Sequence, residues 1–149
     1  MNKQINFDMD GTIADLYGVE GWLSDLIAEK TRPYREARPL VNMSALARRL
    51  NRLQREVYTL TVISWASKNG SAEYNELVRI AKLWWLHKHL PSVSWDMVVV
   101  TAYGEPKHEI GSGILFDDNK EVREGWTGAD EENVAYDVDS ILEILKGLE

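Results

Sequence analysis

The sequence predicts a three-layer α/β fold, in which helices cover both faces of a central parallel sheet. Short β-rich runs alternate with longer stretches of helical periodicity, and several of the β-rich runs end in polar residues. Repeated strand–helix–strand units with right-handed crossovers build such a sheet. The chain has 149 residues, 44% of them apolar, and its sequence shows neither an internal repeat nor a linker. We therefore expect residues 1–149 to form a single domain around one hydrophobic core.

The first part of the chain predicts a strand followed by an insert. Residues 3–7 form the first expected strand, which ends at an acidic segment. Apolar residues then recur at helical spacing over residues 17–30 and predict an amphipathic helix. Residues 31–39 contain two prolines and three arginines, a composition that favours a connecting loop. Because residues 15–42 lie between the first strand and the next helix, we expect them to form a small helical cap.

The rest of the chain continues the alternation of helices and strands. Ser44 is the expected N-cap of a helix that ends at Arg55. The β-branched run Val57–Ile63 predicts the second strand, with Ser64 at its exit. The remaining expected elements are a long helix over residues 72–90, strands over residues 97–101, 113–116 and 133–136, and a closing helix over residues 141–148.

The composition limits the kinds of partner and compartment. The formal net charge is −7, which argues against a nucleic acid partner because binding a phosphate backbone calls for a basic face. The chain has no cysteine, which excludes disulfides and thiolate sites and fits a reducing compartment. No apolar run is long enough to span a membrane. We therefore expect a cytoplasmic protein without a membrane partner, and the oligomeric state stays open.

Polar residues follow four of the expected strands. They are Asp8 and Asp10 after the first strand, Ser64 after the second, Lys107 a few residues past the third, and Asp117 and Asp118 after the fourth. Because the carboxyl ends of parallel strands meet at one edge of a sheet, these side chains are expected to converge. Clustered carboxylates repel one another unless a cation lies between them. Mg²⁺ binds carboxylates, carbonyls and phosphates, so the sequence predicts a magnesium site.

These residues also resemble the motifs of a known family. The segment DMDGT at residues 8–12 resembles the first motif of haloacid dehalogenase-like (HAD) phosphatases. Ser64 is similar to the second motif, Lys107 to the third and ILFDD at residues 114–118 to the fourth, in the order of the family. The resemblance spans residues 5–119. It implies a Rossmann-like, HAD-like fold and a phosphoric monoester hydrolase that acts on a small phosphorylated substrate.

The resemblance implies a catalytic role for the acidic residues. Asp8 would be the nucleophile that forms an aspartyl phosphate, and Asp10 would act as general acid and then general base. Dehalogenases of the superfamily lack the second aspartate, so Asp10 favours phosphate chemistry. Mg²⁺ would be bound by the Asp8 side chain, the Asp10 backbone carbonyl and Asp117, with Asp118 binding directly or through water.

The resemblance implies a phosphate-binding role for the remaining motif residues. Ser64 and the backbone amides around Trp65 would hold the phosphate oxygens. Thr12 would bond to Asp10 or to the phosphate pocket. Lys107 would balance the negative charge of the nucleophile and the phosphoryl group. Lys68 follows the second strand closely and is an alternative to Lys107 for this role.

The sequence leaves the substrate open. The early insert and the Asp-Asp-Asn ending of the fourth motif favour a compact 5'(3')-deoxyribonucleotidase-like member, with a small phosphometabolite such as a nucleoside monophosphate as substrate. One alternative is a phosphatase that acts on nucleic-acid ends or phosphoproteins through an open site. Another is a HAD-fold binding module without catalysis, because a fold alone does not guarantee activity.

The aromatic residues allow more than one interpretation. Tyr17 and Trp22 lie in the expected cap, where they either stack on a nucleobase or cover the core. Trp84 and Trp85 lie within the long expected helix, and their spacing with neighbouring leucines favours packing in the core. The three arginines of residues 31–39 are either solvated or attract an anionic substrate.

Overall fold

A five-stranded parallel sheet forms the centre of the computed structural model, which describes residues 2–149. The strand order is β5-β4-β1-β6-β7. The strands are β1 (Gln4–Phe7), β4 (Thr59–Trp65), β5 (Met97–Thr101), β6 (Ile114–Phe116) and β7 (Val134–Tyr136). Each neighbouring pair is parallel, which confirms the central parallel sheet expected from the sequence.

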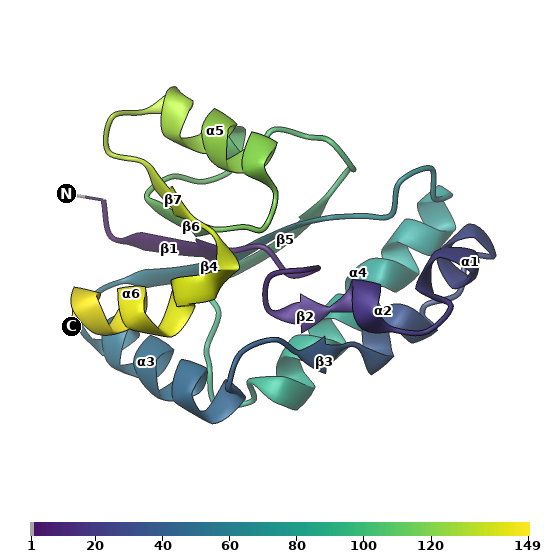
Figure 1. Cartoon of the computed structure of the whole chain (residues 1–149), viewed down its shortest axis with the longest axis horizontal. Helices are drawn as coiled ribbons and strands as arrows, with labels where there is room; N and C mark the ends of the chain where they lie inside the picture. The colour runs from purple at the N-terminus through teal and green to yellow at the C-terminus, as the bar shows by residue number, and fades with distance from the viewer. Residues whose placement is uncertain (1) are drawn as a thin grey trace.

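Helices cover both faces of this sheet. The helices are α3 (Met43–Arg55), α4 (Ala72–His89), α5 (Lys120–Ala129) and α6 (Ile141–Leu148). Figure 1 shows α5 above the sheet and α3 and α6 below it. In β6, Ile114 and Phe116 pack into the cluster that includes α3, α6 and the last turns of α4, whereas Leu115 between them packs on Trp126 of α5. Alternate residues of a strand thus face opposite helix layers, and the three-layer α/β/α arrangement is confirmed.

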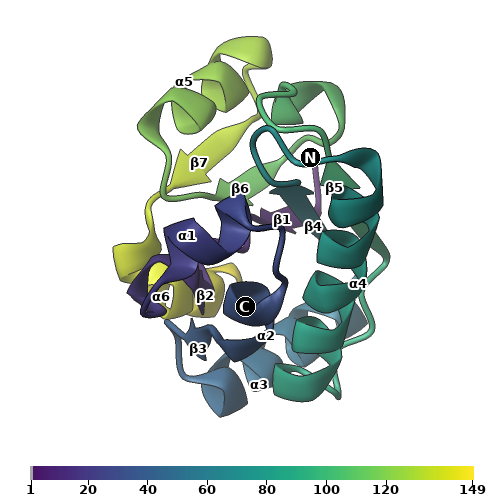
Figure 2. The ribbon, with the colours of Figure 1, turned by 90° about the vertical axis from the view of Figure 1, so that its right-hand side faces the viewer.

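The insert, residues 15–42, lies beyond the carboxyl ends of the strands. Its elements are β2 (Ala14–Asp15), the 3₁₀ helix η1 (Leu16–Gly18), α1 (Trp22–Ile27), α2 (Arg32–Glu36) and β3 (Arg38–Pro39). Because β2 and β3 pair antiparallel, the chain leaves and rejoins the core at one place. Leu16 and Tyr34 of the insert pack on Tyr74, Val78 and Ala81 of α4. Figure 2 faces the insert and shows α4 running beside it.

Two expectations for the insert are wrong. The single helix over residues 17–30 is broken, because Gly21 adopts a left-handed conformation and α1 begins only at Trp22. The loop over residues 31–39 contains a short helix, α2, with Pro33 in its first turn. Proline is tolerated there because a first-turn residue has no intrahelical acceptor for an N–H group.

Three further details differ from the sequence prediction. Asn42, rather than Ser44, caps α3, and its side chain accepts a hydrogen bond from the amide of Ala45 at 2.9 Å. The second strand begins at Thr59, because Val57 adopts a positive φ of 70° just after α3 ends. Helix α5 was not expected at all, since its two glycines weaken the helical pattern.

The structure offers no helix that could cross a membrane within residues 2–149, where none combines sufficient length with sufficient apolar character.

Candidate active site

The loop after β1 presents Asp8 at the centre of the sheet. The Asp8 amide donates to the carbonyl oxygen of Phe116 in β6 at 2.9 Å. The Met9 carbonyl oxygen then accepts hydrogen bonds from the amides of Thr12, Ile13 and Ala14, at 3.1, 3.0 and 3.0 Å. These bonds close a tight turn at the strand exit. The carboxylates of the DMDGT segment are therefore held at the carboxyl end of the sheet.

Asp8 meets the acidic pair that follows β6. Phe7 is in register with Phe116, so Asp8 and Asp117 leave neighbouring strands side by side. One carboxylate oxygen from each of Asp8, Asp117 and Asp118 lies within 4.8 Å of the others. Asp8 and Asp117 are buried, whereas Asp118 is exposed. The structure thus brings together carboxylates that are more than a hundred residues apart in the sequence.

Lys107 joins this carboxylate cluster from the loop after β5. It begins the 3₁₀ helix η2 (Lys107–Glu109), and only 4% of the residue is exposed. Its Nζ atom lies 2.8 Å from Oδ1 of Asp8 and 2.7 Å from Oδ2 of Asp117. Lys68 lies instead with its ammonium 5.7 Å from the ring centre of Tyr103. Of the two lysines considered from the sequence, Lys107 is the one that contacts the first aspartate.

The pKa values reflect this crowding of buried charges. Burial and the charge of Asp8 raise the pKa of Asp117 to about 6, and Lys107 opposes the rise. Partial desolvation of its carboxyl group and the charge of Asp8 also raise the pKa of Asp118 to about 7. Burial lowers the pKa of Lys107, but the charges of Asp8 and Asp117 outweigh burial and raise it overall. A cation among these carboxylates would favour their ionised forms.

Gly11 and Thr12 hold Asp118 close to Asp8. The Thr12 hydroxyl donates to Oδ2 of Asp8 at 2.9 Å and accepts from the Asp118 amide at 3.2 Å. Gly11 has a φ of +80°, and a Cβ atom added there would lie only 2.4 Å from Oδ2 of Asp118. Only glycine fits this position without displacing that carboxylate. The expected bond from Thr12 to Asp10 is replaced by bonds to Asp8 and Asp118.

A second buried lysine organises the other side of the site. Lys82 of α4 is only 1% exposed, and its Nζ atom has three oxygen acceptors. These are Oδ2 of Asp10 at 2.9 Å, Oγ of Ser64 at 2.6 Å and the carbonyl oxygen of Trp65 at 2.7 Å. The ammonium also lies 5.2 Å from the ring centre of Tyr34 in the insert. Lys82 therefore connects two strand exits and the insert.

Sequence reasoning missed Lys82, although a signal was present. Lys82 shares the buried stripe of α4 with Val78 and Trp85, which lie four and three residues away. A lysine on the apolar face of a helix is buried only when its charge has a partner. This position therefore indicated a polar site beneath the helix.

Burial and neighbouring charges shift the pKa of Asp10. Burial raises the pKa of Asp10, Lys82 lowers it and Asp8 raises it further, so that the overall shift is upward. A raised pKa favours a protonated carboxyl group, which can donate a proton. Asp10 therefore has the electrostatic environment of a general acid.

The two tryptophans of α4 have different surroundings. Trp85 is fully buried, and its indole N–H donates to the carbonyl oxygen of Ala37 at 2.8 Å. Trp84 is 45% exposed, so the expectation that it packs in the core is wrong.

Arg32, one of the three arginines of residues 31–39, forms ion pairs within the insert. It bonds to Asp25 at 2.7 Å and to Glu36 at 2.8 Å.

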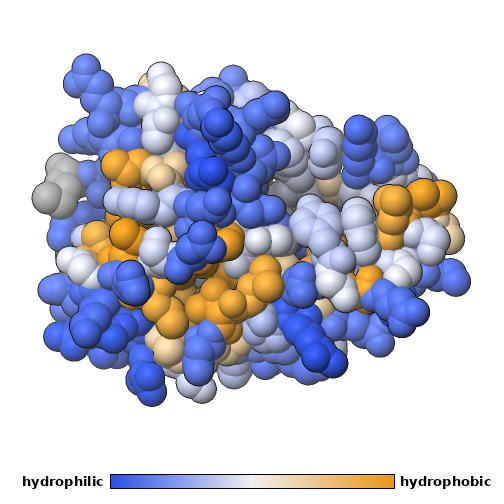
Figure 3. Space-filling view, in the orientation of Figure 1, coloured by the Kyte–Doolittle hydropathy of each residue, from blue (hydrophilic) through white to orange (hydrophobic). Residues whose placement is uncertain are grey.

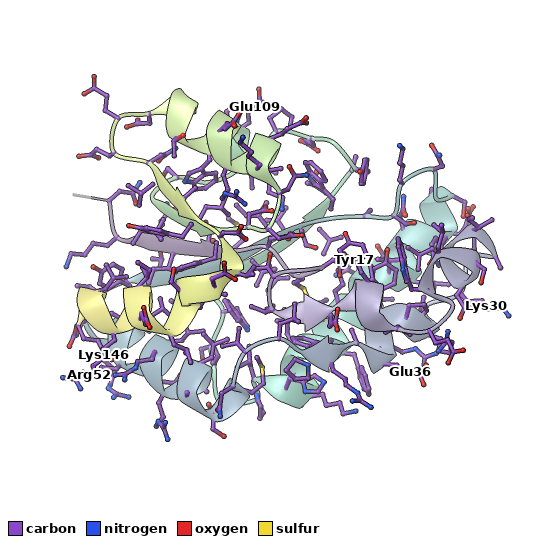
Figure 4. The ribbon with its side chains drawn as sticks, viewed as in Figure 1. Tyr17, Lys30, Glu36, Arg52, Glu109 and Lys146 are labelled. Carbon is purple, nitrogen blue, oxygen red and sulfur yellow. The ribbon has the colours of Figure 1, made fainter. Side chains whose placement is uncertain are left out.

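A cavity of about 570 Å³ opens above the carboxylates. Asp8, Asp10, Lys107 and both residues of the late acidic pair line it together with residues of the insert. Tyr17, labelled in Figure 4, lies between the strand ends and α1. The volume lies within the range of pockets that bind small molecules. The donor set of aspartate oxygens fits a hard divalent cation such as Mg²⁺.

Comparison with known proteins identifies a structural relative. Neither a protein-family model nor a curated protein matches the sequence. The structure is similar to the crystal structure of D,D-heptose 1.7-bisphosphate phosphatase from B. bronchiseptica complexed with magnesium and phosphate. The TM-score is 0.63 at 13% sequence identity, and the match covers 99% of each chain. At this identity the similarity shows a common fold.

Proposed function

We propose that this chain is a HAD-type phosphatase that hydrolyses phosphomonoesters with Mg²⁺ through an aspartyl phosphate on Asp8. The observation that carries the proposal is the convergence of Asp8, Asp117 and Asp118 around one point, with the Lys107 ammonium in contact with two of them. The relative of the same fold is named as a phosphatase complexed with magnesium and phosphate, which agrees with this chemistry.

The proposed reaction has two displacements. A carboxylate oxygen of Asp8 attacks phosphorus, the ester P–O bond breaks, and Asp10 gives its proton to the leaving oxygen. Asp10, now ionised, accepts a proton from a water molecule as the water attacks the phosphoryl group. The bond between Asp8 and phosphorus breaks, and inorganic phosphate is released. The raised pKa of Asp10 supports its role as the acid in the first step.

The other site residues hold the reacting groups. Asp8, the backbone carbonyl of Asp10, Asp117 and Asp118 would hold Mg²⁺. When bound, this ion neutralises phosphate charge and orients the ester for in-line attack. Lys107 compensates the charge of the nucleophile and of the phosphoryl group.

The phosphate oxygens are bound on the side of β4. Ser64 is fully buried at the exit of this strand, where Lys82 donates to Oγ, and we propose that its hydroxyl group donates to a phosphate oxygen. Further donors would come from the backbone amides around Trp65 other than that of Ala66, which already donates to the carbonyl oxygen of Thr101. Thr12 acts on the phosphate through Asp8, to which its hydroxyl donates.

The substrate is proposed to be a small phosphometabolite such as a nucleoside monophosphate. The cavity of about 570 Å³ above Asp8 is large enough for such a molecule. The insert is proposed to act as a small cap within a single domain. Its residues form part of the cavity lining, so they contact whatever is esterified to the phosphate.

The test measures phosphate release with p-nitrophenyl phosphate and a panel of nucleoside monophosphates, with Mg²⁺ and with a chelator. Asp8→Asn keeps the size of the side chain but removes the nucleophile, so turnover should fall at least about a thousandfold. Asp139→Asn, at an exposed position in the 3₁₀ helix η3 (Val138–Ser140), is the matched control. Beryllofluoride, a mimic of the aspartyl phosphate, should inhibit. Equal turnover by Asp8→Asn and wild type would refute the nucleophile. Absence of turnover with Mg²⁺ would refute the phosphatase and favour a HAD-fold binding module without catalysis.

A further inference from the structure

Two aromatic pairs line the cavity above Asp8. The insert supplies Tyr17 and Trp22, whose ring centres lie 4.9 Å apart at an interplanar angle of 77°. The end of β4 supplies Trp65 and the loop after β5 supplies Tyr103, and their ring centres lie 5.0 Å apart at 58°. All four side chains line the same cavity as the carboxylates.

Much of this apolar lining is exposed to solvent. Tyr17 is 51% exposed, Leu23 55%, Ile27 75% and Tyr103 53%. Figure 3 shows a group of hydrophobic atoms over α1 at the right-hand end of the molecule. Exposed apolar side chains gathered around a polar site favour a bound ligand that covers them.

We propose that these aromatic pairs bind a flat aromatic ring carried by the leaving group of the phosphomonoester. This inference rests on the proposed function, because a phosphate held at Asp8 places the esterified alcohol between the cavity walls. The proposed site recognises the aromatic ring and not a particular alcohol. Both nucleobases and simple aryl groups have the required shape.

The chemistry of the walls favours a ring over a sugar. Aromatic faces and edges attract other rings beyond the effect of area burial alone. Leu16, Leu23 and Leu26 line the same cavity and carry only hydrocarbon side chains. Hydroxyl groups of a sugar lose their bonds to water when they lie against such side chains, which costs free energy. The ammonium of Lys68, 5.7 Å from the ring centre of Tyr103, adds a cation beside that wall.

The first experiment compares two pairs of substrates, in each of which only one member carries an aromatic ring. We would measure kcat/KM for 2'-deoxyadenosine 5'-monophosphate against 2-deoxyribose 5-phosphate, and for benzyl phosphate against cyclohexylmethyl phosphate. The expected preference for the member with the aromatic ring is about tenfold or more in both pairs, the usual size of a stacking contribution. A preference in the nucleotide pair alone would mean that the polar edge of the base is recognised, and would overturn ring binding.

The second experiment uses variants of the two walls. Trp22→Leu and Tyr103→Leu should each reduce the preference severalfold toward a ratio of one. Trp84→Leu is the matched control, because Trp84 is exposed on α4 and is absent from the residues that line the cavity. Circular dichroism checks that each variant is folded. An unchanged preference in both wall variants would overturn the proposal.

A binding measurement separates this inference from the phosphatase proposal. Calorimetric titration with 2'-deoxyadenosine, which has no phosphate, should show binding that weakens in Trp22→Leu. Binding without any phosphate release from the substrate panel would refute the phosphatase and support the ring site. Phosphate release that is equally fast with and without a ring, and no binding of the nucleoside, would refute the ring site alone.

Discussion

The Nζ atom of Lys82 lies 2.9 Å from Oδ2 of Asp10, and this contact joins helix α4 to the loop after the first strand. The same ammonium reaches Ser64 at the exit of β4. Two residues that belong to separate motifs in the sequence thus share one buried cation. The position of Asp10, and with it the proposed proton transfer, depends on a helix that contributes none of the expected motif residues.

Replacing Lys82 by methionine should destabilise the protein strongly. The substitution leaves Asp10 and Ser64 without their buried partner, and breaking a buried ion pair in this way costs about 3–5 kcal/mol. The free energy of unfolding, measured by urea denaturation, checks this. Lys88→Met in the last turn of the same helix is the control, because Lys88 is exposed. A loss no larger in Lys82→Met than in Lys88→Met would contradict the assigned contacts.

Gly11→Ala should weaken the binding of Mg²⁺ in addition to straining the backbone. A Cβ atom at this position would collide with Oδ2 of Asp118. Gly104 is a matched control, because its φ is +88° and a Cβ atom there meets nothing within 4 Å. Both substitutions carry the cost of a left-handed backbone, about 1–2 kcal/mol. Only Gly11→Ala displaces a carboxylate, so the apparent Mg²⁺ affinity from titration calorimetry should fall in that variant and stay unchanged in Gly104→Ala.

The sequence could predict the strands and the residues at their ends. Short β-rich runs followed by Asp8, Ser64 or Asp117 carry a local signal for both the strand and its polar exit. Since parallel strands align their carboxyl ends, the convergence of these residues also follows from local patterns.

Other parts of the structure depend on contacts that no local pattern contains. Lys82 has a partner only because α4 passes over the exits of β1 and β4, so its role follows from the packing of the helix. Helix α5 forms despite Gly125 and Gly128 because Trp126 is buried against Ile63 and Leu115 of the sheet. In both cases tertiary contacts outweigh local propensity.

The metal-free protein should lose stability as the pH rises. Burial and Asp8 raise the pKa of Asp117 from 3.8 to about 6, so between these values the folded protein binds more protons than the unfolded chain. Stability is therefore highest below about pH 4 with respect to this group and decreases through about pH 6. Because the pKa of Asp118 is raised to about 7, the pH range over which stability decreases extends upward to about pH 7.

Thermal denaturation at a series of pH values, with a chelator present, checks this prediction. In Asp117→Asn the decrease of the melting temperature between about pH 4 and 7 should be smaller, whereas Asp139→Asn should behave as the wild type. Mg²⁺ binds the ionised carboxylates, so it should raise the melting temperature more at about pH 7 than at about pH 5. The raised pKa of Asp117 would be contradicted by one result. In that result, the melting temperatures of the metal-free wild type and of Asp117→Asn would rise together over this pH range.

Replacing Asp10 by asparagine should affect substrates according to their leaving groups. General acid catalysis contributes about 10²–10⁴-fold when the leaving oxygen needs a proton. An alkyl phosphate such as 2-deoxyribose 5-phosphate has a strongly basic leaving oxygen, so Asp10→Asn should reduce its turnover by about this factor. The p-nitrophenolate ion leaves without a proton, and the first displacement should then be almost unchanged. Burst kinetics measure that first step separately from hydrolysis of the aspartyl phosphate. If the rate of the first step fell equally for both substrates, Asp10 would be a positioning residue and not the general acid. A structural defect slows the reaction of both leaving groups alike.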